Sequence, residues 1–123
     1  MILTGKAKAD FERWYVGSDD KIKHTLQMDL FYSKPHIERA AYYGAWFRES
    51  AFIHIQVYPW GNKIHWCYNL SNWQKDPDLY FYDRLSSLKI RQGREDERFD
   101  SYEIAFNEAI TKANQIYNET KKD

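Results

Sequence analysis

The segment that most constrains the fold is FIHIQVYPWGNKIHWCYNL, at residues 52–70. Its two halves alternate apolar and polar residues, which is the period of a β-strand with one buried face. Gly61 and Asn62 fit a two-residue turn, and the longer PWGN fits a four-residue loop. The sequence therefore predicts a β-hairpin with strands over about 52–58 and 63–70. Both turns keep the same apolar set on one face.

Three other segments carry the spacing of amphipathic helices, with apolar residues three and four positions apart. They lie at about 5–16, 34–49 and 101–118. The first follows Thr4, a suitable N-cap, and stops before Gly17, which can supply a left-handed terminal residue. In the middle helix, small residues between the apolar ones would let another element approach the backbone closely.

The helix starts and two further segments are read from local signals. Ser33 is expected to cap the middle helix, and Asp100 with Glu103 is expected to form a capping box for the last. Residues 19–31 fit both the alternation of a strand and the spacing of a helix, and residues 76–90 also fit either state. Both assignments stay open at this point.

The order of these elements predicts an α+β fold. A two-stranded hairpin is marginal by itself, so helices must cover its apolar face. We expect a small antiparallel sheet packed against about three helices. The 123 residues are the usual length of one domain, and no linker divides them, so residues 1–123 are predicted to form a single domain.

Charge and cysteine content argue against several classes of protein. Lys plus Arg number 18, as do Asp plus Glu, so the chain lacks the basic surplus that is typical of proteins holding duplex nucleic acid. The lone Cys67 cannot form an intrachain disulfide, which favours a reducing compartment. The sequence shows no signal peptide and no apolar run long enough for a membrane. We expect a cytoplasmic protein without a membrane partner.

The outer face of the hairpin raises the question of a metal site. The four-residue loop would place His54 opposite Cys67 and Gln56 opposite His65. The two-residue turn would place Tyr58 opposite His65 and Gln56 opposite Cys67. Zinc binds histidine and cysteine, but these residues lack the paired spacing that is typical of zinc sites. His54, His65 and Cys67 are therefore only a weak metal candidate. The more economical interpretation is that these residues lie on the solvent-facing or partner-facing side of the sheet, with Cys67 a buried or half-buried, inert thiol. We expect no metal or cofactor.

The search for catalytic motifs gives no positive signal. The sequence has no nucleophile elbow, no phosphate loop, no dinucleotide-binding glycine pattern and no HExxH motif. Its acidic pairs lie in segments with the composition of turns, where nothing would raise a carboxyl pKa for acid–base work. We therefore expect no catalytic residues and no enzyme.

The aromatic content instead favours binding. Phe, Trp and Tyr make up 18% of the chain, and Tyr and Trp are the residues that commonly anchor protein interfaces. A protein partner or self-association is the leading hypothesis. Single-stranded nucleic acid, stacking on Trp60 beside Lys63 at the hairpin tip, is the alternative. The candidate interface residues lie on a second face of the middle helix and on the outer hairpin face: Tyr42, Tyr43, Trp46, His54, Gln56, Tyr58, Trp60 and His65.

Two stretches at the ends of the chain carry a resemblance. LTGKAKADFERWY near the start and EAITKANQIYNE near the end, with FYSKPHIERAAYYGAWFRESAFIHI between them, resemble small uncharacterised proteins of phages, prophages and mobile elements of gut bacteria. Residues 71–99 are longer than is usual for that group, and HIERAAYYGAW departs from its pattern. The resemblance implies a small accessory protein in the bacterial cytoplasm. It implies no activity, so it assigns no functional residue.

Overall fold

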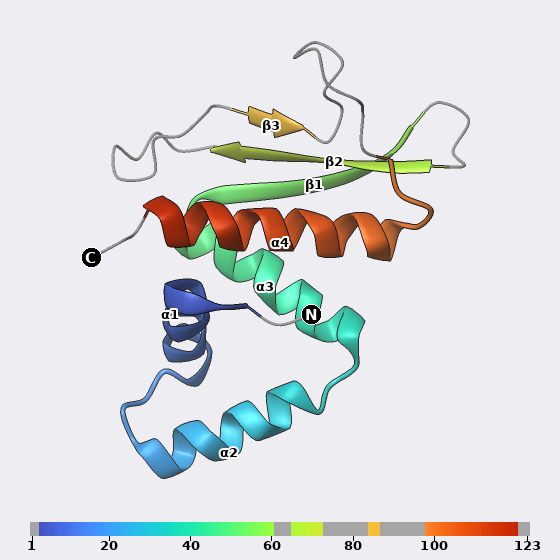
Figure 1. Cartoon of the computed structure of the whole chain (residues 1–123). Coiled ribbons are helices and arrows are strands. Elements are labelled where there is room, and N and C mark those ends of the chain that lie inside the picture. Colours follow the sequence, from blue (N-terminus) through green and yellow to red (C-terminus); the bar gives the residue numbers. More distant parts are fainter. Residues whose placement is uncertain (1–2, 61–64, 73–83, 87–97, 121–123) are drawn as a thin grey trace.

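The fold is seen in a computed structural model, which describes residues 3–60, 65–72, 84–86 and 98–120. Within these ranges, three helices come first along the chain, three strands follow, and a fourth helix comes last (Figure 1). Their bounds, in order, are α1 Gly5–Val16, α2 Lys21–Tyr32, α3 His36–Ser50, β1 Ile53–Trp60, β2 His65–Asn72, β3 Arg84–Ser86 and α4 Tyr102–Thr120. The predicted α+β class is confirmed.

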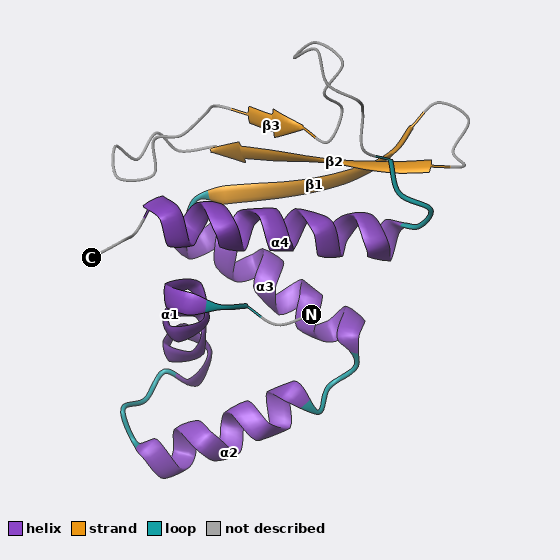
Figure 2. Cartoon of the chain, viewed as in Figure 1, coloured by secondary structure: helices purple, strands orange, loops and turns teal. Residues whose placement is uncertain are grey.

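The strands form one antiparallel sheet in the order β1-β2-β3. Figure 2 shows α4 lying along one face of this sheet, with α3 beside it and α1 and α2 farther from the strands. Helix α4 contacts both β1 and β2, and α3 contacts β1. The helices therefore cover the apolar face of the hairpin, which is the support that an isolated hairpin lacks.

The hairpin is confirmed, but both predicted registers are wrong. β1 continues through Pro59 to Trp60, and Trp60 pairs with His65. The pairing is shifted by two residues from the two-residue-turn register and by four from the other. The four-residue loop ended β1 before Pro59, and the two-residue turn placed Trp60 opposite Lys63, whereas β1 runs to Trp60 and pairs it with His65. β1 is an edge strand of the sheet, and an edge strand tolerates the missing N–H of a proline.

The helices match their predicted positions, while some of their caps differ. Gly17 ends α1 with a φ of 65°, and its N–H donates to the carbonyl of Arg13 at 2.9 Å, as expected. At the start of α4, Ser101 Oγ accepts from the Ile104 N–H at 3.1 Å, so the cap is Ser101 rather than Asp100. Ser33 ends α2 instead of starting α3, whose N-cap position is taken by Pro35.

The two ambiguous segments are now partly resolved. Residues 19–31 lie mainly in α2, which begins where Asp20 Oδ1 accepts from the N–H groups of Ile22 at 2.9 Å and Lys23 at 3.1 Å. An N-cap carboxylate and good helix-forming residues outweigh the apparent strand alternation. Within residues 76–90, Arg84–Ser86 form β3 and the rest lie outside the described residues.

One apolar core joins all four helices to β1 and β2. On the helical side, Phe11 of α1 and Phe31 of α2 are fully buried, with ring centroids 5.2 Å apart. The Phe106 side chain of α4 packs closely against the backbone of α3 at Gly44, because a Cβ on Gly44 would lie 3.1 Å from Cζ of Phe106. The small residues in α3 therefore allow the close approach that their spacing predicted.

Candidate functional site

The residues predicted to form a metal site do not converge. His54 pairs with Ser71, whereas Cys67 pairs with Tyr58, so His54 and Cys67 lie about 13 Å apart along the strands. Cys67 is fully buried, as the inert-thiol interpretation predicted. Within the described ranges, no group of three His, Cys, Asp or Glu side chains is placed to hold a metal ion.

The predicted interface on α3 is largely buried. Tyr43 and Trp46 are each only 1% exposed and pack edge-on against Phe11, while Tyr42 is partly exposed. From the sequence, a helix with aromatic residues on more than one face is either largely buried or part of an interface. Helices α1 and α2 lie on the far side and cover the second aromatic face, so Tyr43 and Trp46 cannot serve as a surface.

The outer hairpin face is only partly available. Gln56 is exposed, and His54, Tyr58 and His65 are half-buried. The side chain of Trp60 and the residue Lys63 lie outside the description, so the proposed stacking tip for nucleic acid belongs to the part of the chain that is not described.

Three large and well-exposed apolar side chains lie elsewhere, on α2. Ile22, Leu26 and Leu30 are 75%, 60% and 63% exposed. Their spacing of four residues aligns them along one face of the helix, and we call them the α2 stripe. The opposite face of α2 carries Met28 and Phe31, which are buried in the core. Helix α2 is thus apolar on two faces, and only one of them is used by the fold.

A carboxylate fixes which face of α2 turns inward. Glu12 of α1 contacts Nε2 of His24 through Oε1 at 3.1 Å and accepts from the Tyr32 hydroxyl through Oε2 at 2.8 Å. Burial, together with this hydrogen bond, raises the pKa of the Tyr32 phenol. These contacts tie both ends of α2 to α1. A polar cleft of about 500 Å³ opens beside them, lined by both acidic and basic side chains, among them Arg13.

A second exposed apolar feature lies where α3 and α4 begin. It is a groove of about 160 Å³ with an almost entirely apolar lining, and we call it the α3–α4 socket. Beside it, His36 Nε2 and Asn107 Oδ1 are 2.7 Å apart. The residues that line the socket are Ile37, Ala40, Ala41, Tyr102, Glu103, Phe106 and Asn107.

The two ends that carry the family resemblance meet in a clasp between α1 and α4. Asn114 Oδ1 accepts from the Thr4 N–H at 2.9 Å, and its Nδ2 donates to the Thr4 hydroxyl at 2.9 Å. One turn later, Asn118 Oδ1 accepts from the Ala7 N–H at 2.8 Å, and its Nδ2 donates to the Thr4 carbonyl at 2.9 Å. The start of α1 is therefore capped by side chains from the last helix. This is a structural role, and nothing in the sequence beyond the two motifs indicated it.

Gly5 completes this clasp because no larger residue fits there. Its φ is +60°, a left-handed conformation that other residues adopt at a cost. A Cβ at this position would also lie 2.9 Å from Nδ2 of Asn118. The glycine of the LTGK stretch is thus explained by backbone geometry and by close approach to α4.

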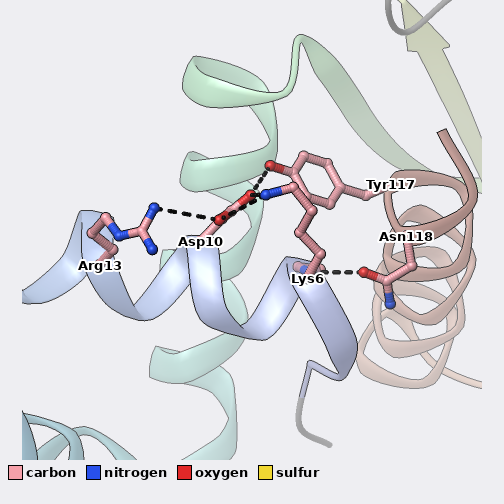
Figure 3. Close-up of polar contacts among 6 residues, drawn as sticks. Lys6, Asp10, Arg13, Tyr117 and Asn118 are labelled. Carbon is pink, nitrogen blue, oxygen red and sulfur yellow. Dashed lines mark hydrogen bonds and ion pairs between the residues drawn. The ribbon is translucent and has the colours of Figure 1, made fainter. Parts of the chain in front are cut away.

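Ionic contacts extend the clasp along α1 (Figure 3). The Tyr117 hydroxyl donates to Asp10 Oδ2 at 2.5 Å, and Lys6 Nζ lies 3.1 Å from the same oxygen. Arg13 Nη1 lies 3.8 Å from Oδ1. Burial by itself raises the pKa of Asp10. The hydrogen bonds from Tyr117 and Lys6, with the charges of Lys6 and Arg13, outweigh burial and leave that pKa below its ordinary value.

Acid titration tests this arrangement. A carboxyl whose pKa is lowered by folding stabilises the fold above its unfolded pKa of about 4, and that contribution is lost as the pH falls through the folded pKa. We expect Asp10→Asn to lower the free energy of unfolding at neutral pH by about 1–3 kcal/mol. The variant should then lose less stability than the wild type on acidification. Urea unfolding at a series of pH values measures both effects, and a parallel fall in the two proteins would contradict the assignment.

Comparison of the chain with models of protein families, with curated proteins and with solved structures found no match. Among the helices that the structure describes, none is long and apolar enough to cross a membrane. Among the described residues, the α2 stripe and the α3–α4 socket are exposed apolar features that the packing of the fold leaves uncovered.

Proposed function

We propose that this protein is a non-enzymatic accessory protein that acts by binding another protein, with the α2 stripe as its principal contact surface. The observation that carries the proposal is the alignment of Ile22, Leu26 and Leu30, each more than half exposed, on one face of a helix whose other face is buried. Scattered exposed aliphatic residues are ordinary, but an aligned set of a few hundred Å² is characteristic of interaction sites.

The context of the proposal comes from the two chain ends. Their resemblance to phage and mobile-element proteins supports an accessory role in a bacterial cytoplasm. The outer hairpin face, with Gln56 exposed, is retained as a secondary surface. The α2 stripe takes precedence because its side chains are more apolar and are all well exposed, whereas His54, Tyr58 and His65 are half-buried.

A single charged substitution tests the surface. Leu26→Asp is expected to weaken partner binding by about 10-fold to 100-fold, because it removes a leucine from the centre of the contact. It should change stability little, since Leu26 is mostly exposed. Tagged protein expressed in cells that carry its gene, followed by cross-linking, capture and quantitative mass spectrometry, measures the recovery of each bound protein.

Thr25→Asp provides the matched control. It adds the same charge to the same helix at an exposed position off the stripe. The control should recover the partners of the wild type, and Leu26→Asp should lose them. Equal recovery by both variants would contradict the proposal, as would a wild-type protein that retains oligonucleotides with the steep salt dependence of phosphate binding.

A further inference from the structure

The α3–α4 socket has the size and chemistry to receive one apolar side chain. Its volume of about 160 Å³ is close to that of an apolar cavity of about 150 Å³ that holds a benzene molecule. Ile37 and Tyr102 stand at its edge with large exposed fractions. A groove of this kind, at the meeting point of two helices, suits an anchoring residue from an amphipathic helix.

We infer that the socket receives the α2 stripe of a second copy of this chain, so that two copies associate reciprocally about a twofold axis. This rests on the proposed function, because it names the partner of the same stripe. Each copy carries one stripe and one socket. A reciprocal arrangement therefore uses both features twice, with each socket receiving Leu26, the central side chain of the other copy's stripe.

Charge supports this occupant over an unrelated apolar helix. Glu103 lines the socket and is exposed, and a second exposed acid, Glu38, follows Ile37 in the first turn of α3. The first turn of the α2 stripe carries Lys21 and Lys23, both exposed, on either side of Ile22. Of the acids nearby, Asp20 is engaged in capping α2, while Asp19 before it and Asp29 near Leu30 are exposed. The lysines at the start of the stripe complement the rim of the socket.

Area and continuity support a closed dimer. One stripe supplies a few hundred Å², which is less than the roughly 800 Å² per partner of a stable interface, and a reciprocal exchange doubles the contact. The stripe ends at Leu30, and the socket begins at Ile37, only a short connection later (Figure 1). Stripe and socket therefore belong to neighbouring parts of the chain, and in a closed twofold contact the stripe of each copy meets the socket of the other.

The experiment separates the two halves of the contact and then recombines them. Leu26→Asp disables the stripe, and Ala41→Trp fills the socket from an exposed position. Each variant alone should raise the dimer dissociation constant by about 10-fold to 100-fold in sedimentation equilibrium. In an equimolar mixture the heterodimer should form more tightly than either variant homodimer, and less tightly than the wild-type dimer, because it keeps one intact stripe–socket contact where each variant homodimer keeps none. Native mass spectrometry with one variant isotope-labelled identifies that species.

The controls and the contradicting outcomes are specific. Thr25→Asp adds the carboxylate of Leu26→Asp to α2 outside the stripe, and Ser50→Trp adds the indole of Ala41→Trp to α3 outside the socket. Both control variants should dimerise like the wild type. Ile22→Asp is a second stripe variant if Leu26→Asp unfolds. Four outcomes would overturn the inference: a wild-type monomer at every concentration, growth beyond a dimer, an Ala41→Trp protein that dimerises normally, or no heterodimer in the mixture. If the wild type is monomeric and captures partners that the Leu26→Asp variant does not capture, this inference fails and the proposed function stands.

Discussion

Replacing Phe11 with alanine is expected to lower the free energy of unfolding by about 3–5 kcal/mol, one of the two largest effects on stability that we predict. Phe11 is fully buried, and its ring centroid lies 4.8 Å from that of Tyr43, 5.2 Å from Phe31 and 5.9 Å from Trp46. The ring thus contacts side chains of α2 and α3 from its place on α1. Its removal leaves a cavity that could be filled only if all three helices moved. Urea denaturation followed by circular dichroism measures the change.

Trp14→Ala is the control for this prediction. Trp14 lies on the same helix, three residues after Phe11, and its ring lies 5.9 Å from the ring of Phe11, but it is 38% exposed. Because much of its surface already meets water, its truncation should cost less than about 2 kcal/mol. If both variants lose a similar free energy of unfolding, burial at the centre of the helical layer does not explain the contribution of Phe11 to stability.

The periodic elements of this chain were predictable, and the directions in which their faces point were not. Alternation in FIHIQVYPWGNKIHWCYNL identified the hairpin, and the spacing of the helical segments located α1, α3 and α4. Tyr43 and Trp46 form a second apolar stripe on α3, which a sequence can equally assign to a core or to an interface. The choice depended on α1 and α2 packing on that side, a tertiary contact that local spacing does not encode.

The α2 stripe is the opposite case, because here an apolar face that could have been buried is exposed. The helical spacing of Ile22, Leu26 and Leu30 was visible in the sequence, and so was a competing strand pattern. Even with the helix assigned, both of its apolar faces are candidates for burial. The contacts of Glu12 with His24 and Tyr32 accompany the burial of the other face, and Glu12 lies 12 residues from His24 and 20 from Tyr32. The register of the hairpin was missed for a related reason, since the edge position of Pro59 becomes visible only once the sheet is assembled.

The clasp between the chain ends leads to the second large effect. Asn118→Ala is expected to lower the free energy of unfolding by about 2–4 kcal/mol, because it removes two hydrogen bonds and leaves the part-buried N–H of Ala7 without its acceptor at the start of α1. Loss of this capping interaction also frees the first turn of α1. Amide hydrogen exchange should therefore show faster exchange at Ala7 and its neighbours, together with a lower urea midpoint.

Asn114→Ala is the control. It tests whether the effect of Asn118→Ala comes from the lost acceptor of the Ala7 N–H or from the loss of any asparagine contact to α1. Asn114 also makes two hydrogen bonds to α1, with the N–H and the hydroxyl of Thr4, but both are solvent-exposed. Water can replace them, so the expected loss is about 1 kcal/mol or less. Equal losses for the two asparagines would mean that burial of the Ala7 N–H does not set the strength of the clasp. A loss confined to Asn118 would show that the NQIYN stretch stabilises a helix that begins more than 100 residues earlier in the chain.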